Sequence, residues 1–140
     1  MRFWDASAVV PLIIDEAADA PAIGADAKLP MVVWWGTVIE AASAIARRER
    51  AGNLSNEQVL RCYDLLQELS AKWLEVLPSD SLRRTAQRLL RVHALKAADS
   101  LQLAAALAAS SNRSDSFDFV CRDSRLSEAA AREGLRVRAA

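Results

Sequence analysis

Apolar and polar residues follow two different periods along the chain, and the change of period marks the expected strands and helices. Short apolar or alternating runs of strand length occupy 2–4, 31–35, 73–77, 117–121 and 135–138. Between them, apolar residues recur at helical spacing, which predicts helices that bury one face. These helices are expected after Ser7 and over 37–51, 55–72, 79–93, 97–109 and 125–133. A less regular helical segment is expected from Glu16 to Lys28.

The order of these elements predicts the fold class, α/β. Helices separate the successive strands, so the strands should run mainly parallel and the helices should cover both faces of the sheet. The run from Met31 to Trp35 is apolar throughout, as in a strand buried on both faces. We expect three layers with a mainly parallel central sheet of about four to five strands. The chain, 1–140, is expected to form a single domain.

Short polar motifs predict several helix ends. The expected N-caps and capping boxes are Ser7, Thr37 with Glu40, Ser55 with Gln58, and Ser79. Gly52 and Gly134 are expected to close two helices. Taken alone, Glu40 is explained by its capping box, so a functional role for it depends on other acidic residues nearby.

The segment 97–109 is an alanine- and leucine-rich helix former with one ionisable side chain, Asp99. Its expected buried face consists of Ala98, Leu101, Ala105 and Ala108. Asp99 lies beside that face in the first turn. There a carboxylate either complements the helix dipole or belongs to a site formed with other acids.

Charge and composition narrow the function. Eighteen basic and eighteen acidic residues cancel, so the net charge does not indicate nucleic-acid binding. Such binding must depend on local clusters of basic residues. The candidate phosphate contacts are Arg47, Arg48, Arg83, Arg84, Arg88 and Arg91. Four of them form a stripe on one predicted helix, a pattern that is usually a solvated face.

The chain has no signal-peptide pattern and no uncharged run long enough to span a bilayer, so a cytoplasmic protein with no membrane contact is expected. Cys62 and Cys121 fall within predicted apolar elements. They are interpreted as small buried hydrophobes in a reducing compartment, not as a disulfide.

Four carboxylates are expected to meet at one edge of the sheet. Asp5 and Asp123 directly follow strands, whereas Glu40 and Asp99 lie in first turns of helices that start at the same edge. A set of acids without His or Cys suits Mg²⁺ or Mn²⁺. Two such ions about 4 Å apart activate water and stabilise the leaving oxygen at phosphorus. Ser7 is placed to orient Asp5 or a bound water.

The surroundings of these acids carry a resemblance. The segments are Phe3–Ala8, Val38–Ala44, Ala98–Ala106 and Asp123–Leu126 with Ala129, Ala130 and Gly134. Together they resemble the PIN domain over nearly the whole chain, and most of all the VapC-type toxins of bacterial toxin–antitoxin pairs. The resemblance implies a Mg²⁺- or Mn²⁺-dependent endoribonuclease that cleaves RNA. Asp5, Glu40, Asp99 and Asp123 match the family's acidic quartet of catalytic, metal-binding residues.

The resemblance also implies partners. It predicts an RNA substrate, a homodimer, and a cognate antitoxin protein whose C-terminal part blocks the active site. The stretch from Cys62 to Leu69 offers apolar helix surface for a dimer.

Two features depart from the family pattern. Cys121 stands where many relatives carry Thr or Ser, so a supporting hydroxyl is missing unless Ser124 supplies it. Trp34 and Trp35 are bulkier than expected ahead of the second acid. They are interpreted mainly as packing residues, with the alternative that one stacks on a base.

The main alternative is a catalytically silent PIN-fold module with a binding or regulatory role, which the loss of any one acid would favour. A receiver domain or a haloacid-dehalogenase-like phosphatase fits less well. The phosphatase requires a second Asp where Ser7 stands, and the receiver requires a later strand-end Lys, which is absent.

Overall fold

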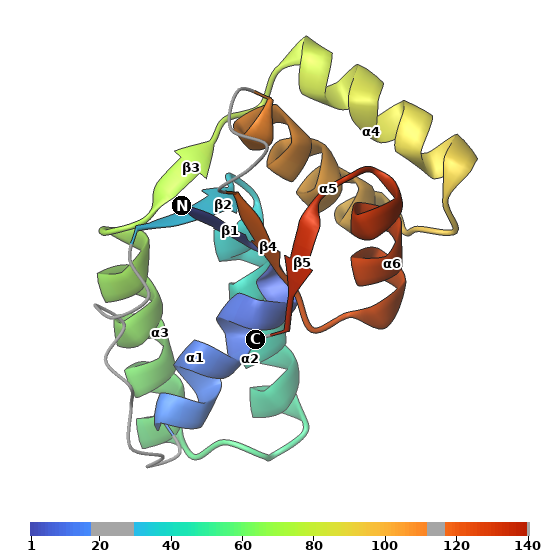
Figure 1. The fold of residues 1–140 in the computed structure, drawn as a ribbon. Helices are drawn as coiled ribbons and strands as arrows, with labels where there is room; N and C mark the ends of the chain where they lie inside the picture. The colour runs from blue at the N-terminus through green and yellow to red at the C-terminus, as the bar shows by residue number, and fades with distance from the viewer. Residues whose placement is uncertain (18–29, 112–116, 140) are drawn as a thin grey trace.

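A sheet of parallel strands forms the middle layer of the computed structural model, which describes residues 1–17, 30–111 and 117–139 (Figure 1). The elements in chain order are β1 (Arg2–Trp4), α1 (Ala6–Ala17), β2 (Met31–Trp34), α2 (Thr37–Arg50), α3 (Asn56–Ser70), β3 (Leu74–Val76), α4 (Asp80–Val92), α5 (Ala97–Ser110), β4 (Asp118–Val120), α6 (Ser124–Arg132) and β5 (Arg136–Arg138). The expected α/β fold class is confirmed. Most of the predicted Glu16–Lys28 segment lies outside the described residues.

The strand order is β3-β2-β1-β4-β5, and every neighbouring pair is parallel. The central strand β1 pairs Phe3 with Val32 on one side and with Phe119 on the other. Since all the strands point the same way, their carboxyl ends share one edge of the sheet, where Asp5 follows β1. In an open parallel sheet this edge is where ligands bind.

Helices cover both faces of the sheet: α1, α2 and α3 lie on one side, and α4, α5 and α6 on the other (Figure 1). The pleat of β1 sends Trp4 into the first helical layer and Phe3 into the second. Phe3 stacks on Phe119, with ring centroids 5.8 Å apart. The three-layer prediction is therefore confirmed. No described helix combines the length and apolar character needed to cross a membrane.

The caps agree with the prediction in part. Ser55 and Gln58 form the predicted capping box, and Ser79 accepts the Leu82 N–H at 3.1 Å. Gly52 and Gly134 follow helices at φ of 75° and 90°, a left-handed conformation that costs glycine little.

Two predicted caps are wrong. The first helix starts at Ala6, before Ser7, and it is the Asp5 carboxylate that accepts the Ser7 N–H, at 3.0 Å. The Thr37–Glu40 box does not form, because Gly36 is the N-cap in a right-handed helical conformation, without a side-chain bond. Glu40 is therefore available for another contact.

The predicted buried face of α5 is only half correct: Ala105 is buried and Leu101 packs against the core, but the other two positions are wrong. Ala98 and Ala108 are exposed, whereas Gln102 and Leu103 are completely buried. The helix packs against α4, α6 and strands of the sheet, so its middle is enclosed on most sides. A helix with almost no polar residues gives periodicity too little contrast to identify its inner face.

The apolar residues proposed for a dimer surface are part of the core. Cys62, Leu66 and Leu69 are buried in the cluster beneath α1, α2 and α3. The prediction that this stretch presents a free apolar face is wrong, because these apolar positions pack where α3 meets α1 and α2.

The two adjacent Trp residues differ sharply in exposure. Trp34 is buried and Trp35 is 50% exposed, with their rings meeting edge to face at 6.4 Å. The residue after them must be glycine, because a Cβ at Gly36 would lie 2.5 Å from the indole nitrogen of Trp34. Trp34 is therefore the packing residue, as expected for at least one of the pair.

Candidate functional site

Asp5 is held at the end of the central strand and is only 3% exposed. Its backbone N–H donates to the carbonyl of Val120 at 3.0 Å, which joins it to the neighbouring strand. Burial raises the pKa of its carboxyl group; hydrogen bonds from Ser7 oppose this rise, and the charge of Asp99 adds to it. Asp5 is therefore a buried acid without a cationic partner among these interactions.

Glu40 reaches from α2 toward α5. Its Oε2 accepts a 2.6 Å hydrogen bond from Nε2 of Gln102, which also donates to Thr37 Oγ1 at 3.0 Å. Burial raises the pKa of Glu40 to about 7, against the Gln102 hydrogen bond and with repulsion from Asp5 and Asp99. The Glu40 side chain is thus fixed by tertiary structure and not by helix capping.

Gln102 is the supporting residue that sequence reasoning missed. It is completely buried, and its Oε1 has no hydrogen-bond partner among the described residues. An isolated amide in a helix of alanine and leucine was the available signal. Burial of a polar group costs free energy unless it is paired, so such a residue indicates a specific contact.

Asp99 and Asp123 occupy the starts of α5 and α6. Asp99 accepts the backbone N–H of Lys96; burial raises its pKa, and the charge of Asp123 adds to the rise. Asp123 is exposed, and its Oδ1 caps α6 by accepting the Leu126 N–H at 2.9 Å. Both acids thus have a local structural contact in addition to their mutual repulsion.

Repulsion links the four acids in a series. Glu40 interacts with Asp5 and Asp99, Asp5 with Asp99, and Asp99 with Asp123. Within the described ranges, no three His, Cys, Asp or Glu side chains are arranged as a ready metal-binding group. The donor chemistry nevertheless fits Mg²⁺ or Mn²⁺, because the donors are all oxygen and a cation would offset the repulsion among them.

Ser7 and Cys121 support this edge of the sheet. Ser7 Oγ accepts the Arg122 N–H at 2.9 Å, which joins the start of α1 to the segment between β4 and α6. The Cys121 sulfur lies 3.6 Å from both Ser7 Oγ and Asp5 Oδ2. Burial and the charge of Asp5 raise the pKa of this thiol, so it remains a protonated donor.

The hydroxyl predicted to replace a family Thr or Ser does not come from Ser124. Ser124 is exposed at the first position of α6. The hydroxyl groups that contact the Cys121 thiol belong to Ser7 and Ser127. Helix geometry explains the difference, because Ser127 lies one turn further along α6 and faces back toward β4.

Two clefts lie beside the acids. The first, about 730 Å³, is lined by Glu40 together with Ser7, Ile39, Ser43, Arg47 and Arg48 among others. The second, about 670 Å³, is lined by Asp99 and Asp123 together with Leu90, His93, Leu95, Lys96 and Arg125 among others. The consecutive residues Ala98 and Asp99 line the first and the second cleft, respectively, so the clefts adjoin at the start of α5.

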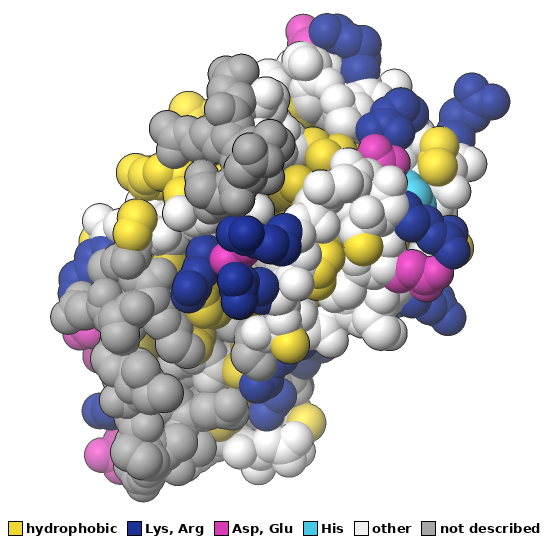
Figure 2. Space-filling view, viewed as in Figure 1, with side chains coloured by type: hydrophobic (Ala, Val, Ile, Leu, Met, Phe, Trp, Pro, Cys, Tyr) yellow, Lys and Arg dark blue, Asp and Glu magenta, His cyan; other side chains and the backbone are white. Residues whose placement is uncertain are grey.

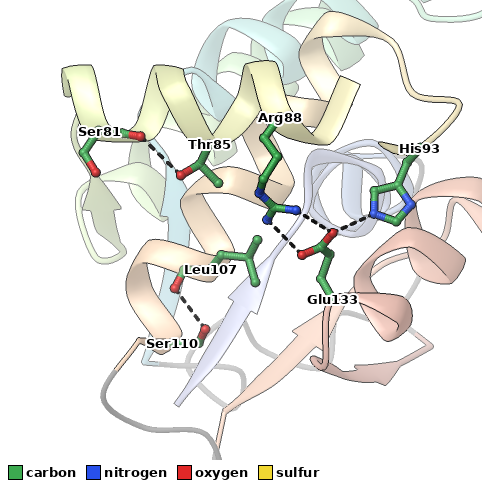
Figure 3. Close-up of polar contacts among 7 residues, drawn as sticks. All are labelled: Ser81, Thr85, Arg88, His93, Leu107, Ser110 and Glu133. Atoms are coloured by element: carbon green, nitrogen blue, oxygen red, sulfur yellow. Dashed lines mark hydrogen bonds and ion pairs between the residues drawn. The ribbon is translucent and has the colours of Figure 1, made fainter. Parts of the chain in front are cut away.

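The candidate phosphate contacts separate into two groups. Arg47 and Arg48 line the first cleft, whereas none of the four stripe arginines on α4 lines either cleft. Arg88 donates to Glu133 from both terminal nitrogens, at 3.1 and 2.9 Å, and Glu133 also accepts a hydrogen bond from Nε2 of His93 at 2.8 Å (Figure 3). This network ties α4 to the end of α6, so Arg88 has a structural role.

Comparison with known proteins gives a fold and no family. No protein-family model matches the chain, and no curated protein matches it by sequence. The crystal structure of PAE2754 from Pyrobaculum aerophilum is similar, with a TM-score of 0.66 and 16% sequence identity. The match covers 97% of this chain and 87% of that chain. At this identity the likeness extends to the three-layer α/β fold.

Proposed function

We propose that this protein is a metal-dependent endoribonuclease of the PIN type, the toxin of a toxin–antitoxin pair. The observation that supports the proposal is the series of interacting carboxylates Asp5, Glu40, Asp99 and Asp123 at the carboxyl edge of a parallel sheet. Acids that repel one another in a partly buried site destabilise a fold, so their presence points to a ligand that neutralises them.

Each residue has a role in this proposal. Asp5 and Asp99, from the central strand and from α5, carry most of the metal binding, and Glu40 and Asp123 complete the site and position the attacking water. When bound, Mg²⁺ or Mn²⁺ supplies an activated water and charge neutralisation at the leaving oxygen of the phosphodiester. Gln102 holds Glu40 in orientation through its 2.6 Å hydrogen bond.

The second candidate is a catalytically silent module of the same fold with a binding or regulatory role. The observation that favours it is that the described residues hold no ready metal-binding group. The two proposals differ in what a divalent cation does: in the first it completes the site, and in the second it binds weakly and produces no cleavage.

The decisive experiment is cleavage of total RNA by the purified protein with Mg²⁺ or Mn²⁺, compared with EDTA and with Asp5→Asn. Asp64→Asn, which changes an exposed acid on α3, is the matched control. Cleavage that requires both the metal and Asp5 supports the nuclease. A folded protein that neither cleaves RNA nor binds the metal supports the silent module.

The toxin assignment, the antitoxin and the homodimer rest on the family resemblance alone. A small antitoxin gene beside this one, whose product abolishes RNA cleavage when mixed with the protein, is the expected finding. An isolated gene, and growth unaffected by expression of the protein alone, would contradict the toxin role without touching the nuclease. Light scattering of the purified protein gives the oligomeric state.

A further inference from the structure

We infer that the two clefts form one binding path for a single strand of RNA, which crosses the start of α5, and that Lys96 and Arg125 hold the strand on the second side. This inference rests on the proposed function and adds residues to it. Neither Lys96 nor Arg125 belongs to the acidic quartet or to the arginines that the sequence pattern singled out.

The arrangement of the acids supports a path that continues on both sides. Glu40 lines the first cleft, and Asp99 and Asp123 line the second. Ala6 and Ser7, which directly follow Asp5, line the first cleft, and Asp5 interacts with Asp99 of the second, so Asp5 lies between the two clefts. A phosphodiester attacked at this junction has one neighbouring nucleotide toward each cleft.

The cations support the same path. Arg47 and Arg48 are exposed in the first cleft, and Lys96 and Arg125 are exposed in the second. The acids repel phosphate, so a strand needs cations on both sides of them to remain bound. Each cleft supplies two cationic side chains, so the acids have positive charge on both sides.

The apolar lining favours unpaired bases. Ile39, 66% exposed, lines the first cleft, and Leu90, 42% exposed, lines the second. Unpaired bases present their faces to protein side chains, whereas bases in a duplex are stacked on one another and offer chiefly phosphate and sugar. The RNA bound in the two clefts is therefore a single strand and not a duplex.

The test is fluorescence anisotropy of labelled oligouridylates in EDTA, so that neither metal nor cleavage is required. Wild type should bind a strand of about ten nucleotides more tightly than one of about three, since the longer one fills both clefts. The variants are Lys96→Gln/Arg125→Gln, Arg47→Gln/Arg48→Gln and, as the matched control, Arg84→Gln/Arg91→Gln on α4. Thermal melting checks that each is folded.

Each cleft variant should lose most of the affinity gained by lengthening the strand. Its salt dependence, as the slope of log K against log salt, should fall by about 1.4, since each phosphate contact on a single strand contributes about 0.7. The α4 control should bind like wild type. Restoring the charge in Lys96→Arg/Arg125→Lys should restore binding, which separates a charge effect from a folding defect.

Three results would overturn the inference: wild-type affinity in Lys96→Gln/Arg125→Gln, equal weakening by the α4 control, or duplex RNA bound as tightly as a single strand. The proposed function is tested separately. If the protein cleaves RNA with metal and Asp5 but Lys96 and Arg125 are dispensable, only the path is wrong. If no strand binds and no RNA is cleaved, both proposals fail.

Discussion

Two buried aspartates in the same sheet have opposite surroundings. Asp118 on β4 is 4% exposed and pairs with Arg2 at 3.7 Å, with Arg138 at 2.8 Å, and with Arg136. Figure 2 shows basic side chains gathered around an acidic one on this side of the molecule. Burial opposes ionisation of Asp118, but hydrogen bonds from Arg136 and Arg138 outweigh it and lower its pKa.

Asp5, equally buried, has no arginine beside it among the described residues: its carboxylate contacts the Ser7 N–H and the Cys121 thiol. Burial raises its pKa, and the charge of Asp99 adds to the rise. Asp118 has the partners of a structural ion pair that holds β1, β4 and β5 together. Burial therefore does not distinguish a structural acid from a functional one; the presence or absence of cationic partners does. The following four experiments test this contrast, beginning with the largest expected effect.

Adding Mn²⁺ to the metal-free protein should raise its Tm strongly. At about 100 times Kd, a ligand that binds only the folded state stabilises it by about 2.7 kcal/mol, or about 10 °C for a chain of this size. Differential scanning calorimetry should find this shift in wild type and in Asp118→Asn, but not in Asp5→Asn. An unchanged Tm in wild type at millimolar Mn²⁺ would contradict the proposal that the acids bind a metal.

Asp118→Asn should lower the Tm of the metal-free protein by about 5 °C. An amide keeps an acceptor but loses the charge-assisted hydrogen bonds from Arg136 and Arg138 and the ion pair with Arg2. RNA cleavage measured well below the Tm should be unaffected. If this variant melts like wild type and loses activity, Asp118 belongs to the functional site and the contrast is broken.

Asp99→Asn should change the metal-free Tm in the opposite direction, with a rise of a few degrees. The substitution removes repulsion from Asp123 and from Asp5 while preserving an acceptor for the Lys96 N–H. Thermal melting in EDTA is the measurement, with the exposed Asp64→Asn as the control. A fall of several degrees would make Asp99 a structural residue like Asp118.

The last test measures how stability changes with pH, where the expected effect is a slope and not a single shift in Tm. Glu40 has an ordinary pKa of 4.5 and a folded value of about 7, so between these values the unfolded chain has lost a proton that the folded one keeps. Stability in EDTA should therefore fall as pH rises from 4.5 to 7 and then level off. Urea unfolding of Glu40→Gln should have a shallower slope in this window, whereas Glu57→Gln on α3 should match wild type.

The sequence pattern was sufficient for the sheet and for the helix ends that local bonding decides. Ser55 with Gln58, and Ser79, cap their helices within four residues, so nothing distant interferes. Thr37 and Glu40 have the same spacing, yet they form no capping box. Gly36 adopts a helical conformation, and both side chains instead accept hydrogen bonds from Gln102. Competition from a residue far along the chain is invisible to local spacing.

The candidate site was predictable to the extent that topology decides it. Asp5 and Asp123 follow strands, and a parallel sheet brings such positions to one edge. The cleft residues Lys96 and Arg125 stand alone in the sequence and belong to no stripe, so only the packing of α4, α5 and α6 reveals them. Arg88 is the opposite case. Its position in a basic stripe made it a candidate phosphate contact, but its side chain is bonded to Glu133.

The hydrogen bond from Gln102 to Glu40 joins a helix on one face of the sheet to a helix on the other. A change at either position leaves a buried polar group without its partner. The residues at positions 40 and 102 should therefore covary. In a randomised library selected for activity, survivors should keep both residues or exchange both together, and single replacements at either position should be depleted.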